Sequence, residues 1–102
     1  MAILEVSITP LGTGSTSISD YVADCHKILE EEKQINYRLT PMGTILEGDL
    51  DVLLRVVRRM HERPFEKGAT RVSTQIKIDD RRDTKASMEK KVSSVMQKLN
   101  PA

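Results

Sequence analysis

Carboxylates and hydroxyls recur at alternate positions in segments of this chain that have the pattern of β-strands. Glu5, Ser7 and Thr9 alternate with apolar residues, and Glu47 and Ser73 hold comparable places in two later segments. A carboxylate in the middle of a strand is unfavourable, so we expect each one to have a compensating partner. A small cationic or amino-bearing molecule fits this set, because carboxylates accept hydrogen bonds and hydroxyls both donate and accept them.

Three explanations of these polar residues stay open at this point. The first is a noncatalytic site for a small ligand. The second is an enzyme in which Glu5 or Glu47 acts as a general base, which requires a raised pKa and a dry pocket. The third is a purely structural oligomer whose polar faces pack on one another. Without any ligand, Arg38, Lys77 or a partner subunit would satisfy the carboxylates. We favour a binding protein over an enzyme, because no nucleophile, metal site or histidine–carboxylate pair accompanies the two glutamates.

The two histidines and the one cysteine do not form a catalytic or metal-binding pattern. His26 and His61 fall on different predicted helices, and neither has a second ligand at a recognised metal spacing. Cys25 lies on the apolar stripe of its helix, which predicts a buried thiol whose thiolate form is disfavoured. We therefore expect no metal and no cofactor.

Hydrophobic periodicity predicts seven elements. Four segments alternate between apolar and polar residues as strands do, namely residues 3–9, 35–40, 44–47 and 70–78. Three further segments repeat their apolar residues at helical spacing. The first helix begins at a capping pair of Ser17 and Asp20, the second begins at Asp49 and closes at Pro64 and Gly68, and the third is capped by Asp83 or Thr84.

This order, βαββαβ followed by an extra C-terminal helix, predicts an α+β fold of the ferredoxin-like type with a four-stranded antiparallel sheet. The apolar stripe of the last helix needs a surface, either on this sheet or on a neighbouring subunit. Edge strands also invite pairing with another chain, so we expect a homo-oligomer. One sheet face should meet the two crossover helices with an apolar set of side chains, which comprises Leu4, Val6, Ile8, Leu39, Val72, Ile76 and Ile78.

Composition narrows the classes of function. The 102 residues suit a single domain over residues 1–102. Sixteen Lys and Arg against fifteen Asp and Glu give a net charge of +1, and the aromatic residues are one Phe and two Tyr. This balance argues against a nucleic-acid partner, which calls for basic patches and stacking side chains. No apolar run is long enough to span a membrane, and we expect a cytoplasmic protein.

Three segments of the chain, residues 6–14, 37–48 and 68–79, carry a family resemblance. Their most specific parts are Pro-Leu-Gly-Thr from Pro10 and Pro-Met-Gly-Thr-x-x-Glu-Gly from Pro41. On these motifs the chain resembles the small thiamine-binding proteins of the YkoF-like superfamily. The resemblance implies a ferredoxin-like fold, assembly as dimers or as tetramers built from two dimers, and binding of thiamine or its hydroxymethylpyrimidine part without turnover.

The resemblance also implies roles for the polar residues. Glu47 or Glu5 would accept a hydrogen bond from the pyrimidine amino group or offset the thiazolium charge. Ser7, Thr44 and Ser73 would bond the ring nitrogens. The expected ligand site, on the polar sheet face or at a subunit interface, therefore comprises Glu5, Ser7, Thr9, Thr44, Glu47 and Ser73.

Overall fold

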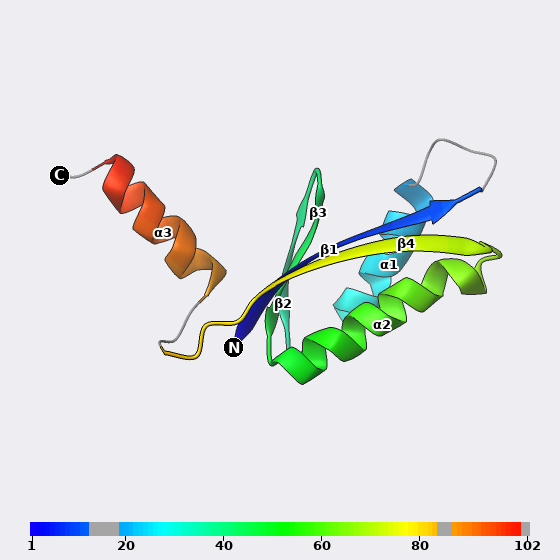
Figure 1. The fold of residues 1–102 in the computed structure, drawn as a ribbon, viewed down its shortest axis with the longest axis horizontal. Helices are drawn as coiled ribbons and strands as arrows, with labels where there is room; N and C mark the ends of the chain where they lie inside the picture. Colours follow the sequence, from blue (N-terminus) through cyan, green and yellow to red (C-terminus); the bar gives the residue numbers. More distant parts are fainter. Residues whose placement is uncertain (13–18, 84–86, 101–102) are drawn as a thin grey trace.

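The protein folds into one four-stranded antiparallel sheet with three helices, which confirms the predicted α+β ferredoxin-like fold (Figure 1). The computed structural model describes residues 1–12, 19–83 and 87–100. The strands pair in the order β2-β3-β1-β4. The strands are β1 (Ala2–Leu11), β2 (Asn36–Thr40), β3 (Gly43–Gly48) and β4 (Arg71–Asp79), and the helices are α1 (Ser19–Glu31), α2 (Leu50–Glu66) and α3 (Met88–Leu99).

The pairing register sorts the alternating side chains onto two faces, as the sequence predicts. Leu4 of β1 lies opposite Leu46 of β3 and Ile78 of β4, and Val6 lies opposite Ile76. Residues that face each other across antiparallel strands point to the same side of the sheet. Most apolar members of the strands therefore share one face, and Ile3 and Ile45 lie on the other.

Helices α1 and α2 cover the central part of this face and enclose the core (Figure 1). The prediction that Leu39, Ile76 and Ile78 meet these helices was wrong, because they lie on the edge strands β2 and β4 and are 58%, 45% and 43% exposed. Leu4 and Leu46 from the sheet, Leu29 from α1 and Leu53 from α2 are each 0 % exposed. Burial of one such side chain is worth about 1.5–3 kcal/mol of transfer free energy. The opposite sheet face, which carries the carboxylates and hydroxyls of β1, is left without a crossover helix.

Helix α2 ends at Glu66, between the two residues that were expected to close it, Pro64 and Gly68. Pro64 is buried inside the helix. A proline removes one backbone hydrogen bond from the helix, and near the C-terminus this loss affects only the last turns. The chain then turns at Gly68, whose φ of +100° places it in a backbone region that favours glycine.

Helix α3 stands apart from the rest of the fold and gives the molecule a long dimension of 52 Å (Figure 1). None of its residues is buried. Its N-cap is Ser87, whose hydroxyl accepts a hydrogen bond from the Lys90 backbone N–H at 3.0 Å. The prediction of a cap at Asp83 or Thr84 was therefore wrong: Asp83 instead forms an ion pair with Arg81. Thr84 and the expected first-helix cap Ser17 lie outside the described residues.

Candidate ligand-binding site

Most of the expected site residues share the sheet face that lies away from α1 and α2, here called the polar face. Thr9 lies opposite Ser73 across β1 and β4. Glu5 lies opposite Ile45, two residues from Glu47, so the two glutamates are diagonal neighbours on β1 and β3. Diagonal neighbours are about 7–8 Å apart, close enough for one small molecule to contact both carboxylates. The expected residues on the polar face are Glu5, Ser7, Thr9, Glu47 and Ser73.

Glu47 is a buried carboxylate with two identified partners. The residue is 7 % exposed. Its Oε1 accepts a hydrogen bond from Asn36 Nδ2 at 3.2 Å, and its Oε2 accepts one from the Met88 backbone N–H at 2.7 Å. Met88 is the first residue of α3, so the carboxylate lies at the positive end of that helix, where negative charge is stabilised.

These partners differ from the expected ones, Arg38 and Lys77. Asn36 could have been found, because it alternates with apolar residues on the strand that pairs with the Glu47 strand. The contact with Met88 could not be predicted from the sequence, because it depends on where α3 is placed. Lys77 lies opposite Glu5, which is exposed.

A hollow lies beside Glu47, between β2 and the first turn of α3. Its volume is about 340 Å³, enough for a small heterocycle. Each oxygen of an ionised carboxylate has two acceptor positions, so Glu47 can accept further hydrogen bonds from a ligand. The lining residues are Asn36, Tyr37, Arg38, Glu47, Ser87, Met88 and Glu89.

Thr44 is the expected site residue that the structure separates from the others. It lies opposite Val6, on the face that meets α1 and α2, and it is 5 % exposed. Its Oγ1 is 3.2 Å from Nε2 of His26 on α1. The alternation of β3 already indicated this, because residues two apart in a strand point the same way and Leu46 is a core residue. Thr44 therefore cannot bind the same molecule as the polar-face residues.

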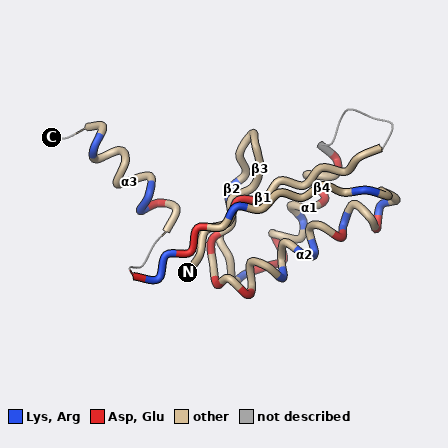
Figure 2. The backbone as a smooth tube through the Cα atoms, viewed as in Figure 1, with Lys and Arg blue, Asp and Glu red and all other residues tan. Residues whose placement is uncertain are grey.

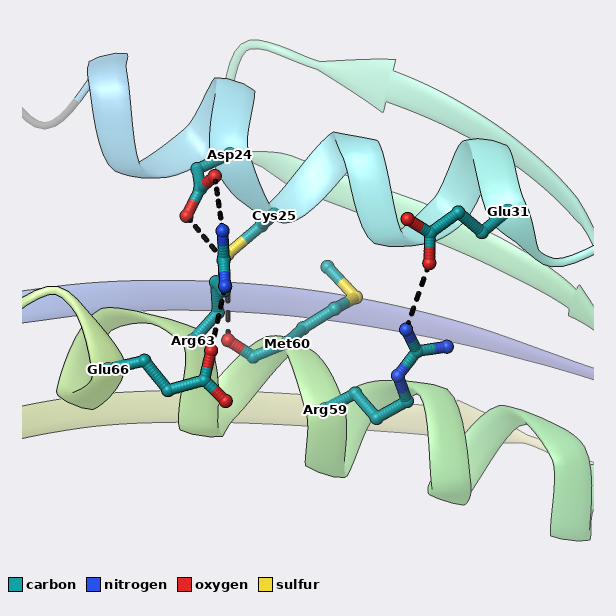
Figure 3. A network of polar contacts seen from close by, with 7 residues as sticks. All are labelled: Asp24, Cys25, Glu31, Arg59, Met60, Arg63 and Glu66. Atoms are coloured by element: carbon teal, nitrogen blue, oxygen red, sulfur yellow. Dashed lines mark hydrogen bonds and ion pairs between the residues drawn. The ribbon is translucent and has the colours of Figure 1, made fainter.

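Many charged residues elsewhere form local ion pairs, and residues 1–12, 19–83 and 87–100 show no extended stripe of one sign (Figure 2). Figure 2 shows acidic and basic residues interspersed along α2. Arg63 of α2 binds Asp24 of α1, and Arg59 binds Glu31, so both pairs join the two helices (Figure 3). Within the ranges that the structure describes, no three His, Cys, Asp or Glu residues are grouped to hold a metal ion. In the same ranges, no helix is both long and apolar enough to cross a bilayer.

Comparisons with known proteins agree on one group of relatives. Residues 4–96 match the family model of the thiamine-binding protein. The chain is 52% identical over 104 residues to the UPF0045 protein YqgV of Bacillus subtilis, a match that covers 99% of this chain and 100% of that one.

Solved structures give the same grouping. The hypothetical protein MJ1052 of Methanocaldococcus jannaschii matches with a TM-score of 0.84 and 33% identity, covering 94% of this chain and 96% of that one. A candidate thiamine biosynthesis/salvage protein of Thermotoga maritima matches with a TM-score of 0.76 over 92% of this chain and 97% of that one. At 19% identity, this last likeness shows the shared fold.

Proposed function

Because this chain belongs to the thiamine-binding protein family, we propose that it is a noncatalytic, oligomeric binding protein for thiamine or its hydroxymethylpyrimidine part. The observation that carries the proposal is Glu47, a carboxylate only 7 % exposed on a sheet face that no crossover helix covers. A carboxylate held in this way is oriented before a ligand arrives, which lowers the entropic cost of binding.

The polar face offers the groups that thiamine requires. The aminopyrimidine ring presents an amino donor, and the thiazolium ring carries a positive charge. Glu47 accepts from the amino group in the hollow beside β2, and Glu5, its diagonal neighbour, offsets the positive charge. The hydroxyl of Ser7, two residues beyond Glu5 on β1, supplies a further hydrogen bond. Thr9 and Ser73 pair six residues along β1 from Ile3, the residue opposite Glu47, which is about 20 Å at the rise of a strand, so they do not contact the same ligand molecule.

A second copy of the chain would complete the site. The apolar stripe of α3 is exposed, with Val95 at 56% and Leu99 at 68%. The polar face also carries Ile3 and Ile45, which are half-buried and lie beside the two glutamates. In the proposed assembly, the stripe of one protomer packs on these isoleucines of its partner and covers the ligand. Dimers joined in pairs give the tetramer, and we place the protein in the cytoplasm.

The residues favour binding over catalysis. A carboxylate acting as general base needs a reactive centre to act upon and a second group to complete proton transfer. The groups that touch Glu47 are an amide side chain and a backbone N–H, and neither titrates near neutral pH. The arrangement therefore holds a charge in place and does not relay a proton.

Calorimetric titration with thiamine and with hydroxymethylpyrimidine tests the proposal. We expect saturable heat for the wild type, with thiamine affinity reduced at least tenfold in Glu47→Gln and less in Glu5→Gln. Glu30→Gln, at an exposed position on α1, is the matched control and should bind as the wild type does. Circular dichroism of each variant checks the fold. The proposal is contradicted if neither ligand gives measurable heat of binding, or if the NMR spectrum of the mixture shows a new product.

A further inference from the structure

Strand β4 forms one edge of the sheet along its whole length. It spans nine residues, Arg71–Asp79, and among the strands that the structure describes it pairs with β1 alone (Figure 1). Every second residue of an edge strand directs its backbone N–H and C=O outward, where another strand can pair with them. Proline often blocks such edges, and β4 contains none. The opposite edge strand, β2, has only five residues and adjoins Pro41, so β4 is the edge better suited to a further strand.

The helix side of this edge carries exposed apolar side chains. Ile76 and Ile78 of β4 are both exposed. Helix α2 runs beside β4, since His61 Nδ1 and Thr74 Oγ1 are 2.7 Å apart. Leu54 of α2 is also exposed and lies seven residues before His61, which places both on the same side of the helix. A strand added to β4 would remove this apolar surface from water.

The side chains of β4 are complementary to those of a second, antiparallel β4. A two-fold axis through Gln75, the middle residue of the strand, pairs all nine positions. On the polar face this register sets Arg71 opposite the partner's Asp79. On the helix side it sets Val72 opposite the partner's Ile78. Opposite charges that face each other across antiparallel strands stabilise the pairing, so the strand ends attract each other.

Neighbouring registers lack this complementarity. An axis at Thr74 sets Arg71 opposite the partner's Lys77, and an axis at Lys77 sets the two lysines opposite each other. Like charges in these positions destabilise strand pairing. An axis at Ile76 brings no opposite charges of the two strands together. The charges therefore favour the register that is centred on Gln75.

The two charged residues of this register are available for contact with another copy. Arg71 and Asp79 are exposed at opposite ends of β4. At the rise of a strand they are about 27 Å apart within one chain, so they cannot pair with each other there. Asp79 uses Oδ2 in an ion pair with Lys91 of α3, and its Oδ1 can accept hydrogen bonds from a second cation.

We propose that β4 binds the β4 of a second copy, antiparallel and centred on Gln75, which joins the two sheets into one. The proposal rests on the oligomer of the proposed function, in which α3 joins two copies into a dimer. One β4 contact is a single strand wide, which is narrow for a stable dimer. Two such contacts form when two dimers meet, and the second is then intramolecular, so together they hold the tetramer.

A charge swap tests the register. Arg71→Asp sets two acids opposite each other and should halve the mass in light scattering coupled to size exclusion, from tetramer to dimer. The double variant Arg71→Asp, Asp79→Arg exchanges the charges and should restore the tetramer. Because the two positions lie far apart within one chain, this rescue requires contact between copies.

A second variant tests the axis without changing Arg71 or Asp79. Gln75→Lys sets two lysines face to face at the two-fold axis and should also give the dimer. Gln34→Lys, the same change at an exposed position outside the sheet, is the matched control and should keep the tetramer. Circular dichroism checks that each variant is folded.

The proposal is overturned if the folded charge-swap variant stays dimeric, or if Gln75→Lys stays tetrameric. It is also overturned if the wild type is no larger than a dimer, a result that leaves β4 to a strand of another protein. Thiamine calorimetry separates these failures from failure of the proposed function. Arg71 lies opposite Leu11, six residues along β1 from Glu5, so Arg71→Asp should still bind thiamine as a dimer.

Discussion

The thiol of Cys25 donates a hydrogen bond to the backbone carbonyl of Met60, with Sγ and O 3.5 Å apart (Figure 3). In a regular helix this carbonyl would accept from the N–H four residues later. That residue is Pro64, which has no N–H. A side chain of α1 therefore supplies the donor that the sequence of α2 lacks.

This relationship predicts a specific coupling between Cys25 and Pro64. Cys25→Ala should lower the free energy of unfolding by about 1 kcal/mol for the lost hydrogen bond, in addition to its packing cost. In a Pro64→Ala background the restored N–H bonds Met60, so the same change should cost less. Chemical denaturation of the four proteins in this double-mutant cycle measures the difference. Equal costs of Cys25→Ala in both backgrounds would show that the thiol is not the substitute donor.

A second contact between the helices predicts how stability depends on pH. Arg63 donates from Nε to Asp24 Oδ2 at 2.7 Å and from Nη2 to Oδ1 at 3.3 Å (Figure 3). These hydrogen bonds hold the pKa of Asp24 below its ordinary value of 3.8. The native state then binds fewer protons than the unfolded chain, so the pair stabilises the fold above pH 3.8 and loses this effect as the pH falls through the native-state pKa.

Asp24→Asn tests this dependence. At neutral pH the variant should unfold about 4 °C below the wild type, the scale of a well-oriented, partly buried ion pair in a domain of this size. The difference should shrink as the pH falls below 3.8. Thermal unfolding followed by circular dichroism across this range measures it. A difference that stays constant down to pH 2 would refute the ion-pair explanation.

Two adjacent leucines of α2 test the position of the core. Leu53 is 0 % exposed and Leu54 is 42% exposed, so they differ in burial but not in helix propensity. Leu53→Ala should lower the free energy of unfolding by about 3 kcal/mol, because it leaves a cavity. Leu54→Ala should lower it by less than about 1 kcal/mol. Urea denaturation of both variants measures these values, and similar losses would contradict the described orientation of α2.

The order of elements and the two sheet faces could be predicted because each depends on local periodicity. Leu4 and Val6 alternate with polar residues, and Leu53, Val57 and Met60 recur at helical spacing, so both patterns are visible in the chain itself. The extent of α2 was harder to predict. Pro64 normally argues against helix, and its tolerance depends on a donor from another element.

The candidate site likewise has features that could be predicted from local periodicity and features that depend on tertiary packing. The shared face of Glu5 and Glu47 followed from alternation alone. The burial of Glu47 did not, because it requires α3 to begin at Met88, whose backbone N–H reaches the Glu47 carboxylate. The sequence could have placed Thr44 on the face opposite to the glutamates, because Thr44 is two residues from the core residue Leu46. The sequence could not have predicted the cavity that Thr44 lines, because this cavity depends on how α1 packs on the sheet.

The exposed stripe of α3 gives the last prediction. Val92, Val95, Met96 and Leu99 are between 50% and 68% exposed, an apolar surface that a stable monomer seldom leaves open. Replacing Val95 and Leu99 by Ser should shift the protein from oligomer to monomer in light scattering coupled to size exclusion. It should also weaken thiamine binding, because in the proposed assembly the partner's helix covers the polar face. Gln97→Ser, outside the stripe on the same helix, should change neither mass nor affinity. A wild type that is already monomeric, or a double variant that keeps its oligomeric mass, would exclude this stripe as the subunit contact.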